Sequence, residues 1–221
     1  MVGKRSYDDG CAAAHALDLL GERWALLVVR ELLLGAKRFT DLRAGLPGVS
    51  PNVLTQRLTE LEAAAVVQRR RLPPPAAAAV YELTAWGQEL EPIILALGRW
   101  GARSPVRKPG APLGVDSLVL SWRTMFDAQR AADFKGRVEL HIATQVYHAV
   151  VRDRQLHIAR GAQQDADAVL KAEVATFVAL VYEAAKFNDA LRDGALKVSG
   201  DKHIAKRFLG LFPLPQVATP A

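Results

Sequence analysis

The side chains best suited to binding chemistry lie on one predicted helix. That helix is predicted from Pro51 to about Ala64, because Ser50 is a favourable N-cap and proline at the first helical position loses no hydrogen bond. Its outward face carries hydroxyl and amide groups, which can hydrogen-bond base edges and phosphates of nucleic acid. These outward residues are Asn52, Val53, Gln56, Thr59 and Glu60, with Thr55 and Arg57 at the flanks. An ordinary amphipathic surface helix is the alternative interpretation.

The neighbouring segments favour nucleic-acid binding. Leucines and an alanine recur at helical spacing on the opposite side of this helix, so they form one buried stripe. Two short strands follow it, and Arg69, Arg70 and Arg71 lie on the first, where a basic run suits phosphate contact. The alternative interpretation is that this basic run lies on a solvated strand edge. The whole order is that of a winged helix-turn-helix. Its parts are a helix Phe39–Leu46, a turn Pro47-Gly48, a stripe of Leu54, Leu58, Leu61 and Ala65, strands Val66–Leu72 and Val80–Leu83, and a tip Pro73–Ala79.

Three more helices are predicted around this motif. One spans Cys11–Leu20 and a strongly apolar one spans Trp24–Leu34, each followed by a glycine. A long helix is predicted over Ala85–Arg103, where Thr84 can act as the N-cap. Its apolar residues are spaced for burial against a partner surface: Leu90, Ile93, Ile94, Leu97 and Trp100.

Composition narrows the class of protein. Half of the 221 residues are apolar, so a sizeable core is available, and the net charge of +6 fits a polyanionic partner. The net charge is +2 over residues 1–104 and +4 over residues 105–221, so the case for nucleic acid rests on local arrangement. A single cysteine excludes an internal disulfide and fits a reducing compartment. We find no secretory signal or membrane-length apolar run and therefore expect a cytoplasmic protein.

Residues 11–103 resemble the HxlR family of winged-helix regulators, within the broader MarR-like group. The resemblance lies in Cys11, in ALDLLGERWALLVVRELLLG (16–35), in RFTDLRAGLPGVSPNVLTQRLTELE (38–62) and in YELTAWGQELEPIILALGRWG (81–101). It implies a homodimer paired through its first and last helices, and double-stranded DNA as partner. Two recognition helices would then address half-sites about one helical turn apart. The expected DNA-binding residues are Thr40, Arg43, Ser50, Pro51, Asn52, Val53, Thr55, Gln56, Arg57, Thr59, Arg69, Arg70 and Arg71.

Two positions depart from the family pattern. Thr59 stands where the family often has a basic residue, so one phosphate contact is absent. The wing tip PPPAAAA (73–79) is uncharged, where the family usually has polar residues. Both departures predict a shallow dependence of DNA affinity on salt, because each lost phosphate contact lowers the slope by about 0.9.

A second domain is predicted after a linker. Residues 1–103 form the first domain, and the proline- and glycine-rich segment 104–114 is expected to be the linker. In residues 115–221, apolar and polar residues alternate, which is typical of half-buried strands. We expect an α+β domain, an antiparallel sheet with helices on one side. The predicted strands are Val138–Ile142, Gln145–Val151, Gln155–Arg160, Val169–Glu173 and Ala195–Ser199, and the predicted helices are Asp116–Ala131, Ala175–Lys186 and Asp201–Leu211.

The second domain is similar to the sterol-carrier-protein fold. The likeness lies in segments 138–161 and 165–184 and in DALRDGALKVSGDKHIAKRFLGLFP (189–213). It implies an apolar cavity between sheet and helices that holds a hydrophobic small molecule. The expected lining is Trp122, Phe126, Phe177, Leu180, Phe208 and Phe212. The alternative is that these side chains fill the core of a small domain.

Catalysis is not expected from this sequence. The five histidines are scattered, and the chain has no phosphate-binding loop, no GxSxG and no GxGxxG, so we assign no catalytic residue, metal or cofactor. Cys11 is the one reactive candidate, because a helix N-terminus favours the thiolate. A small residue buried at a dimer interface is the alternative for Cys11.

The sequence thus predicts a dimeric transcription regulator, controlled by an apolar effector or with a second domain that extends the dimer. Two other functions remain open: a hydrophobic small-molecule carrier that dimerises through its first half, and a thiol-based redox or electrophile sensor using Cys11.

Overall fold

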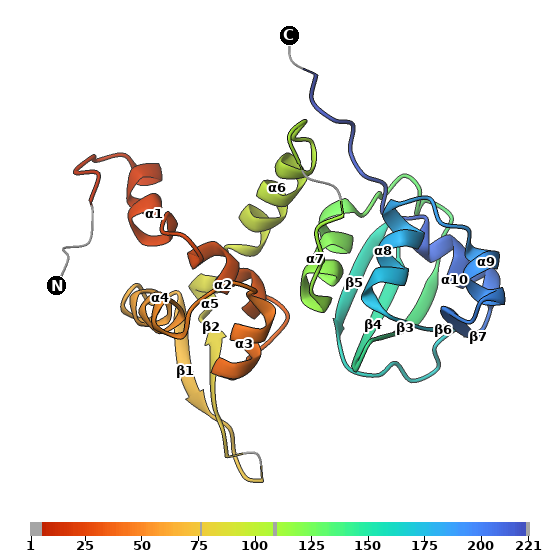
Figure 1. Ribbon diagram of the computed structural model, residues 1–221, viewed down its shortest axis with the longest axis horizontal. Helices are drawn as coiled ribbons and strands as arrows, with labels where there is room; N and C mark the ends of the chain where they lie inside the picture. Colours follow the sequence, from red (N-terminus) through yellow and green to blue (C-terminus); the bar gives the residue numbers. More distant parts are fainter. Residues whose placement is uncertain (1–5, 76, 108–109, 220–221) are drawn as a thin grey trace. The chain divides into compact units, whose positions relative to one another are not determined.

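The computed structural model describes residues 6–75, 77–107 and 110–219 (Figure 1). The chain divides into two compact units, residues 1–94 and 95–221, and the division falls within helix α6 (Glu91–Ala102). It therefore lies before the linker expected at 104–114. The second half of α6 belongs to the second unit because it bonds to that unit. Arg99 Nη1 donates to the carbonyl of Thr124 at 3.2 Å.

The first unit has the order expected of a winged helix-turn-helix. Valines and leucines make up most of its core, including Leu54, Leu58 and Leu61, each no more than 1% exposed. The elements are α1 (Ala12–Leu20), α2 (Ala25–Leu32), α3 (Phe39–Gly45), α4 (Pro51–Ala63), β1 (Val67–Arg71), β2 (Ala79–Leu83), α5 (Ala85–Gln88) and the start of α6.

One prediction in this unit is wrong. The single helix expected over Ala85–Arg103 is two helices, α5 and α6, separated at Glu89 and Leu90. Proline inside a helix lacks the N–H and clashes with the preceding turn, and Pro92 is tolerated here as the second residue of α6. The predicted cap is confirmed, because Thr84 Oγ1 accepts from the Gly87 N–H at 2.9 Å.

A buried carboxylate lies among α2, α3 and the segment joining them. Glu31 is 2% exposed, and its carboxylate accepts from Lys37 Nζ at 2.5 Å and from Arg30 Nη2 at 2.8 Å. Gly45, at the end of α3, packs so closely that a Cβ there would collide with the Glu31 carboxylate. The ion pairs and the absent side chain together set how α3 lies against α2.

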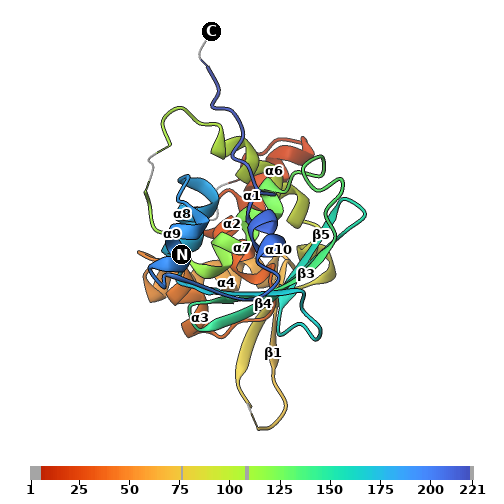
Figure 2. The same cartoon turned by 90° about the vertical axis from the view of Figure 1, so that its right-hand side faces the viewer.

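The second unit is a five-stranded sheet with helices on one face (Figure 2). The strand order is β5-β4-β3-β6-β7. Val138, Leu140 and Ile142 point to the helices and are fully buried, whereas the residues between them are at least partly exposed. The elements are α7 (Val115–Met125), β3 (Gly136–Ile142), β4 (Gln145–Arg152), β5 (Gln155–Arg160), β6 (Ala168–Ala172), α8 (Val174–Tyr182), α9 (Phe187–Arg192), β7 (Leu196–Gly200) and α10 (Lys202–Leu209).

The sheet is mixed, which corrects the expected antiparallel sheet. Strands β3 and β6 are parallel, with Val138 opposite Ala168, and the other neighbouring pairs are antiparallel. Segment 161–167 returns the chain from the edge strand β5 to the far side of β3. The Gln163 N–H donates to the Glu139 carboxylate at 2.8 Å on the way. Alternation of apolar residues reports which face a side chain occupies and carries no information on strand direction.

Two helices of this unit also differ from expectation. Helix α7 ends at Met125, before the predicted end at Ala131. Helix α8 ends at Tyr182 and a separate α9 follows, because Ala184 has a left-handed backbone (φ +58°) that stops the helix. Of the helices that the structure describes, none is both long and apolar enough to cross a membrane.

We predict that Gly45→Ala destabilises the first unit by roughly 2 kcal/mol, because the new methyl group has to displace a buried, ion-paired carboxylate. Urea unfolding followed by far-ultraviolet circular dichroism measures this. Gly101→Ala is the matched control, since no atom lies within 4 Å of a Cβ at that helical position. Equal stability of Gly45→Ala and the control would show that the close approach is unimportant.

Candidate nucleic-acid interface

Helix α4 presents one polar face. Ser50 Oγ accepts from the Val53 N–H at 3.3 Å, and Pro51 occupies the first turn, so the helix starts as the sequence predicts. Its leucines turn inward. Residues three and four apart share a helix face, and this spacing brings together the exposed Asn52, Thr55, Gln56 and Thr59, with Val53 partly exposed beside them.

Arg57 does not belong to this face. Its side chain is 9% exposed, its guanidinium bonds the Glu60 carboxylate, and Nη2 lies 3.7 Å from Glu22 Oε2. Arg57 is three residues after Leu54 and four before Leu61, so it falls on the buried stripe. The expected contact of Arg57 with DNA stays a prediction, and the pairing of its charge inside the unit disfavours it.

The amide of Gln56 is also engaged. Gln56 Nε2 donates to Glu60 Oε1 at 3.0 Å, and Thr59 Oγ1 donates to the carbonyl of Thr55 at 3.1 Å. A base contact by Gln56 therefore exchanges one hydrogen bond for another, at a net cost of about 0.5–1.5 kcal/mol if the new bond is poor. Within the described chain, the side chains of Asn52 and Thr55 make no hydrogen bond, so they can contact DNA without that exchange.

The arginine run of the wing is divided between two faces. Alternate residues of a strand point in opposite directions, so Arg69 and Arg71 share one face of β1 and Arg70 lies on the other. Arg70 Nε and Nη2 donate to the Glu82 carboxylate at 2.9–3.0 Å, and these bonds lower the pKa of Glu82. Arg69 lies 6.0 Å from the centroid of the Tyr81 ring. In the sequence, the two-residue period of a strand was the signal that places Arg70 on the opposite face from Arg69 and Arg71.

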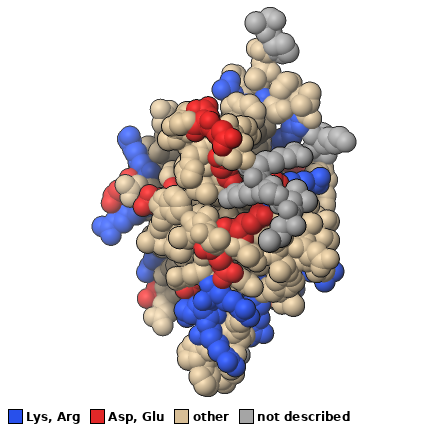
Figure 3. Space-filling model, turned by 90° about the vertical axis from the view of Figure 1, so that its left-hand side faces the viewer, with Lys and Arg blue, Asp and Glu red and all other residues tan. Residues whose placement is uncertain are grey.

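Charge ends before the tip of the wing. Figure 3 shows Lys and Arg side chains gathered where the wing meets the rest of the first unit, with an uncharged tip beyond them. The tip comprises prolines and alanines over 73–79, of which Ala76 lies outside the described residues. Thr40 and Arg43 are exposed on α3.

The aromatic side chains expected to line a cavity are mostly core. Trp122, Phe177 and Phe208 are fully buried, and Phe212 is 1% exposed. Their ring centroids lie 5.1–6.1 Å apart in stacked and edge-on pairs. Phe126 is half-buried, 6.3 Å from Phe212. The alternative, that these side chains fill the core, is what the structure shows for Trp122, Phe177 and Phe208.

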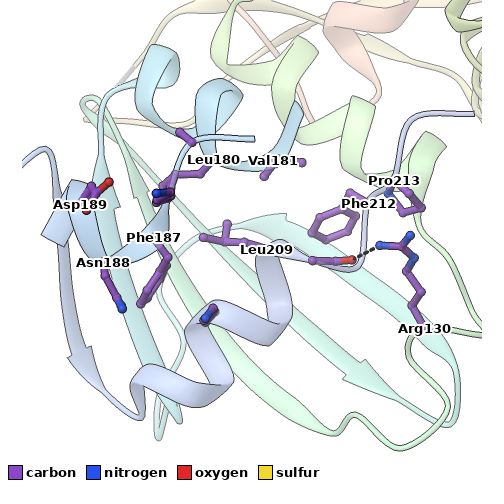
Figure 4. Close-up of a pocket in the computed structure, with 13 residues that line it drawn as sticks. Arg130, Leu180, Val181, Phe187, Asn188, Asp189, Leu209, Phe212 and Pro213 are labelled. Atoms are coloured by element: carbon purple, nitrogen blue, oxygen red, sulfur yellow. Dashed lines mark hydrogen bonds between the residues drawn. The ribbon is translucent and has the colours of Figure 1, made fainter. Parts of the chain in front are cut away.

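An open cleft of about 560 Å³ lies beside this core (Figure 4). Of the expected residues, Leu180 and Phe212 line it. The sequence reasoning missed the rest of its lining, because α9 and its flanks were not predicted. These further lining residues include Arg130, Lys186, Phe187, Asp189, Lys206 and Leu209.

Cys11 is exposed at the N-terminus of α1. The nearby backbone N–H groups of Ala14 and Ala13 lower the pKa of its thiol, because they stabilise the thiolate. Within the described residues no group of three or more His, Cys, Asp or Glu side chains could hold a metal ion.

The first unit matches known regulators. The profile described as HxlR-like helix-turn-helix matches residues 19–108. An uncharacterised HTH-type transcriptional regulator of Synechocystis sp. is 38% identical over 92 residues, which cover 42% of this chain and 68% of that protein. The chain belongs to the HxlR-like helix-turn-helix family. A second member, YvaP of Bacillus subtilis, also an uncharacterised HTH-type transcriptional regulator, is 41% identical over 85 residues, 38% of this chain and 79% of YvaP.

The second unit of this HxlR-like protein matches a different profile, described as alkyl sulfatase C-terminal, over residues 113–218. A solved stereoselective inverting sec-alkylsulfatase from Pseudomonas sp. is 20% identical, with a TM-score of 0.39. The match covers 44% of this chain and only 15% of the alkylsulfatase. The likeness to sterol carrier proteins stays a prediction.

We predict that Cys11 is alkylated at a lower pH than an ordinary thiol. Since the thiolate is the nucleophile, a lowered pKa shifts the rise in rate below the roughly 8.5 of a free cysteine. Iodoacetamide labelling between pH 6 and 10 measures the midpoint, and the single cysteine makes it unambiguous. The urea-unfolded chain is the control and should return the ordinary midpoint. Coincident folded and unfolded profiles would contradict the assignment.

Proposed function

We propose that this protein is a dimeric transcription regulator that binds a pseudo-palindromic site in double-stranded DNA. The exposed polar face of α4 is the observation that carries the proposal, because hydroxyl and amide groups on a helix of this motif suit the major groove. The family membership supports it, since its relatives are described as HTH-type transcriptional regulators. A regulator of this kind acts in the cytoplasm.

The DNA-contacting set follows from exposure. We assign base contacts to the polar face of α4 and phosphate contacts to Arg69 and Arg71, which leave β1 on one side. Ser50 and Pro51 start the helix and bring its backbone N–H groups towards a phosphate. Thr40 and Arg43 would add contacts from α3. Arg57 is left out because its charge is paired internally.

Exposed apolar residues on two helices support a homodimer. Neither α1 nor α6 has a buried residue within the single chain. Leu17 on α1 is 52% exposed, and Ile93, Leu97 and Trp100 on α6 are 57%, 48% and 74% exposed. Large apolar surface that stays exposed usually marks an interaction site. These are the helices through which the family resemblance implies dimerisation.

Control by a small molecule would act through the second unit. The cleft beside α8, α9 and α10 is of a size that holds small ligands, which occupy roughly 300–1,000 Å³. Helix α6 belongs to both units, and at its end the Arg103 carbonyl accepts from the Ala218 N–H at 2.8 Å. The C-terminal segment that makes this bond begins at the cleft, with Phe212 and Pro213. A ligand would couple to DNA only if it favours one arrangement of the recognition helices.

Two other functions keep specific support. The cleft also fits a hydrophobic carrier that dimerises through its first half, and such a carrier would bind ligand and show no affinity for DNA. The lowered pKa of exposed Cys11 fits a redox or electrophile sensor, an idea that a fully responsive Cys11→Ser variant would exclude. We assign no enzymatic activity to the chain.

Gln56→Ala should weaken specific DNA binding roughly tenfold, because one amide contact to a base is lost. Affinity for unrelated DNA should hold, since phosphate contacts remain. Genomic fragments selected by the wild-type protein provide the site, and footprinting measures the affinity. Gln129→Ala, an exposed glutamine in the second unit, is the matched control. An unchanged footprint for Gln56→Ala would refute the proposed base-reading face.

Substitutions on the two faces of the wing should differ in their effect on the salt dependence of DNA affinity. Arg69→Gln/Arg71→Gln should lower the slope of log affinity against log salt by up to about 1.8, at about 0.9 for each phosphate contact. Arg70→Gln should change it much less, because Glu82 already pairs with Arg70. Lys171→Gln/Lys197→Gln, which removes the same charge from the second unit, should leave the slope unchanged. An Arg70→Gln effect as large as the effect per residue of the double variant would overturn the assignment.

A further inference from the structure

The cleft of the second unit has an apolar floor beside polar and charged side chains. Figure 4 shows side chains from α8, from α9 and from the end of α10 and beyond, all facing one space. Leu209 is 6% exposed and Phe187 is 9% exposed, so the floor is firmly packed and does not depend on an occupant. The apolar lining residues are Leu180, Val181, Phe187, Leu209, Phe212 and Pro213.

The lining carries a positive charge. Arg130, Lys186 and Lys206 contribute three cations, and Asp189 is the one acidic residue among the lining residues of this cleft. Asp189 is already compensated, because its carboxylate lies 3.1 Å from Arg192 Nη2. Anions near such a surface are attracted, whereas a cation is repelled.

The two lysines are the cations most available to a ligand. Arg130 Nη1 donates to the Gly210 carbonyl at 3.3 Å, and Arg130 Nε lies 3.6 Å from Asp127 Oδ2. Lys186 and Lys206 are exposed, and neither has a hydrogen-bond or ion-pair partner among residues 6–75, 77–107 and 110–219. A flexible ammonium group without a partner can follow an anionic headgroup at little cost in lost contacts.

We propose that this cleft binds a monomeric single-chain amphiphile with an anionic headgroup, such as a carboxylate or a sulfate. The chain would lie on the apolar floor, where each buried methylene contributes to affinity. The headgroup would be held by Lys186 and Lys206, with Arg130 adding to the positive field. The assignment rests on the proposed control by a small molecule and names its chemical class, and the site is the cleft outside the closed aromatic core.

Titration calorimetry on the full chain tests the proposal with dodecanoate and dodecyl sulfate, each below its critical micelle concentration. Dodecanol and dodecyltrimethylammonium provide the same chain with a neutral or cationic head, and acetate provides the anion without the chain. We expect both anionic amphiphiles to bind, the alcohol to bind at least fivefold more weakly, and acetate and the cation to show no binding.

Variants separate the headgroup from the chain. Lys186→Gln/Lys206→Gln should weaken dodecanoate roughly tenfold and leave dodecanol unchanged, because two exposed cations each contribute modestly. Leu180→Glu should abolish binding of both anions, since it puts a negative charge in the apolar floor. Lys171→Gln/Lys197→Gln is the matched control: these exposed lysines lie opposite each other on β6 and β7 and do not line the cleft. Thermal midpoints verify that each variant is folded.

Three outcomes would overturn the proposal: equal affinity for dodecanol and dodecanoate, equal affinity for dodecyltrimethylammonium and dodecanoate, or equal loss in the control double variant. DNA affinity is measured on the same samples without amphiphile. Lost amphiphile binding with intact DNA binding refutes the cleft assignment alone. Amphiphile binding without DNA affinity refutes the proposed regulator and supports the carrier.

Discussion

The geometry of the first unit depends on one buried carboxylate. Glu31 is held by Lys37 and Arg30, and Gly45 leaves the room it occupies, so the end of α3 is drawn onto α2. Lys37 also exchanges two backbone hydrogen bonds with Tyr81 on β2, at 2.8 and 2.9 Å. The same residue therefore joins the helices to the wing. An unpaired charge at this depth would cost several kcal/mol, so the buried carboxylate and its cationic partners depend on one another.

Internal hydrogen bonds and ion pairs determine which polar side chains of the first unit are available to contact DNA. Arg57 and Arg70 carry the charge that DNA binding needs, yet each is paired with a carboxylate of its own unit. The exposed side chains that have no ion pair within the unit include Asn52, Thr55, Arg69 and Arg71. Such a surface favours reading of base edges over strong attachment to phosphates, because much of the affinity of strongly basic proteins comes from released counterions.

In the second unit, the packed aromatic core and the open cleft lie in different places. Its aromatic side chains close on one another around Trp122 and leave the rings mostly sealed from solvent. The open space lies outside them, where α9 and the chain after α10 meet. Because Phe212 belongs to both the core and the cleft, a change in the cleft reaches the packed interior directly. It also reaches the C-terminal segment, whose backbone bonds Arg103 at the end of α6.

The sequence by itself determined the faces of this protein and most of its elements, whereas it did not separate α5 from α6 or indicate α9. Leucines at 54, 58 and 61 and alternating residues at 138, 140 and 142 specify a helix stripe and a strand face, because these periodicities are local. Only the tertiary structure decided which charges are paired, which strands are parallel and where the cleft opens. Glu22 with Arg57, Arg70 with Glu82, and Glu139 with Gln163 are contacts between residues far apart in the chain. No local pattern encodes such partners, since they depend on how separate elements meet in space.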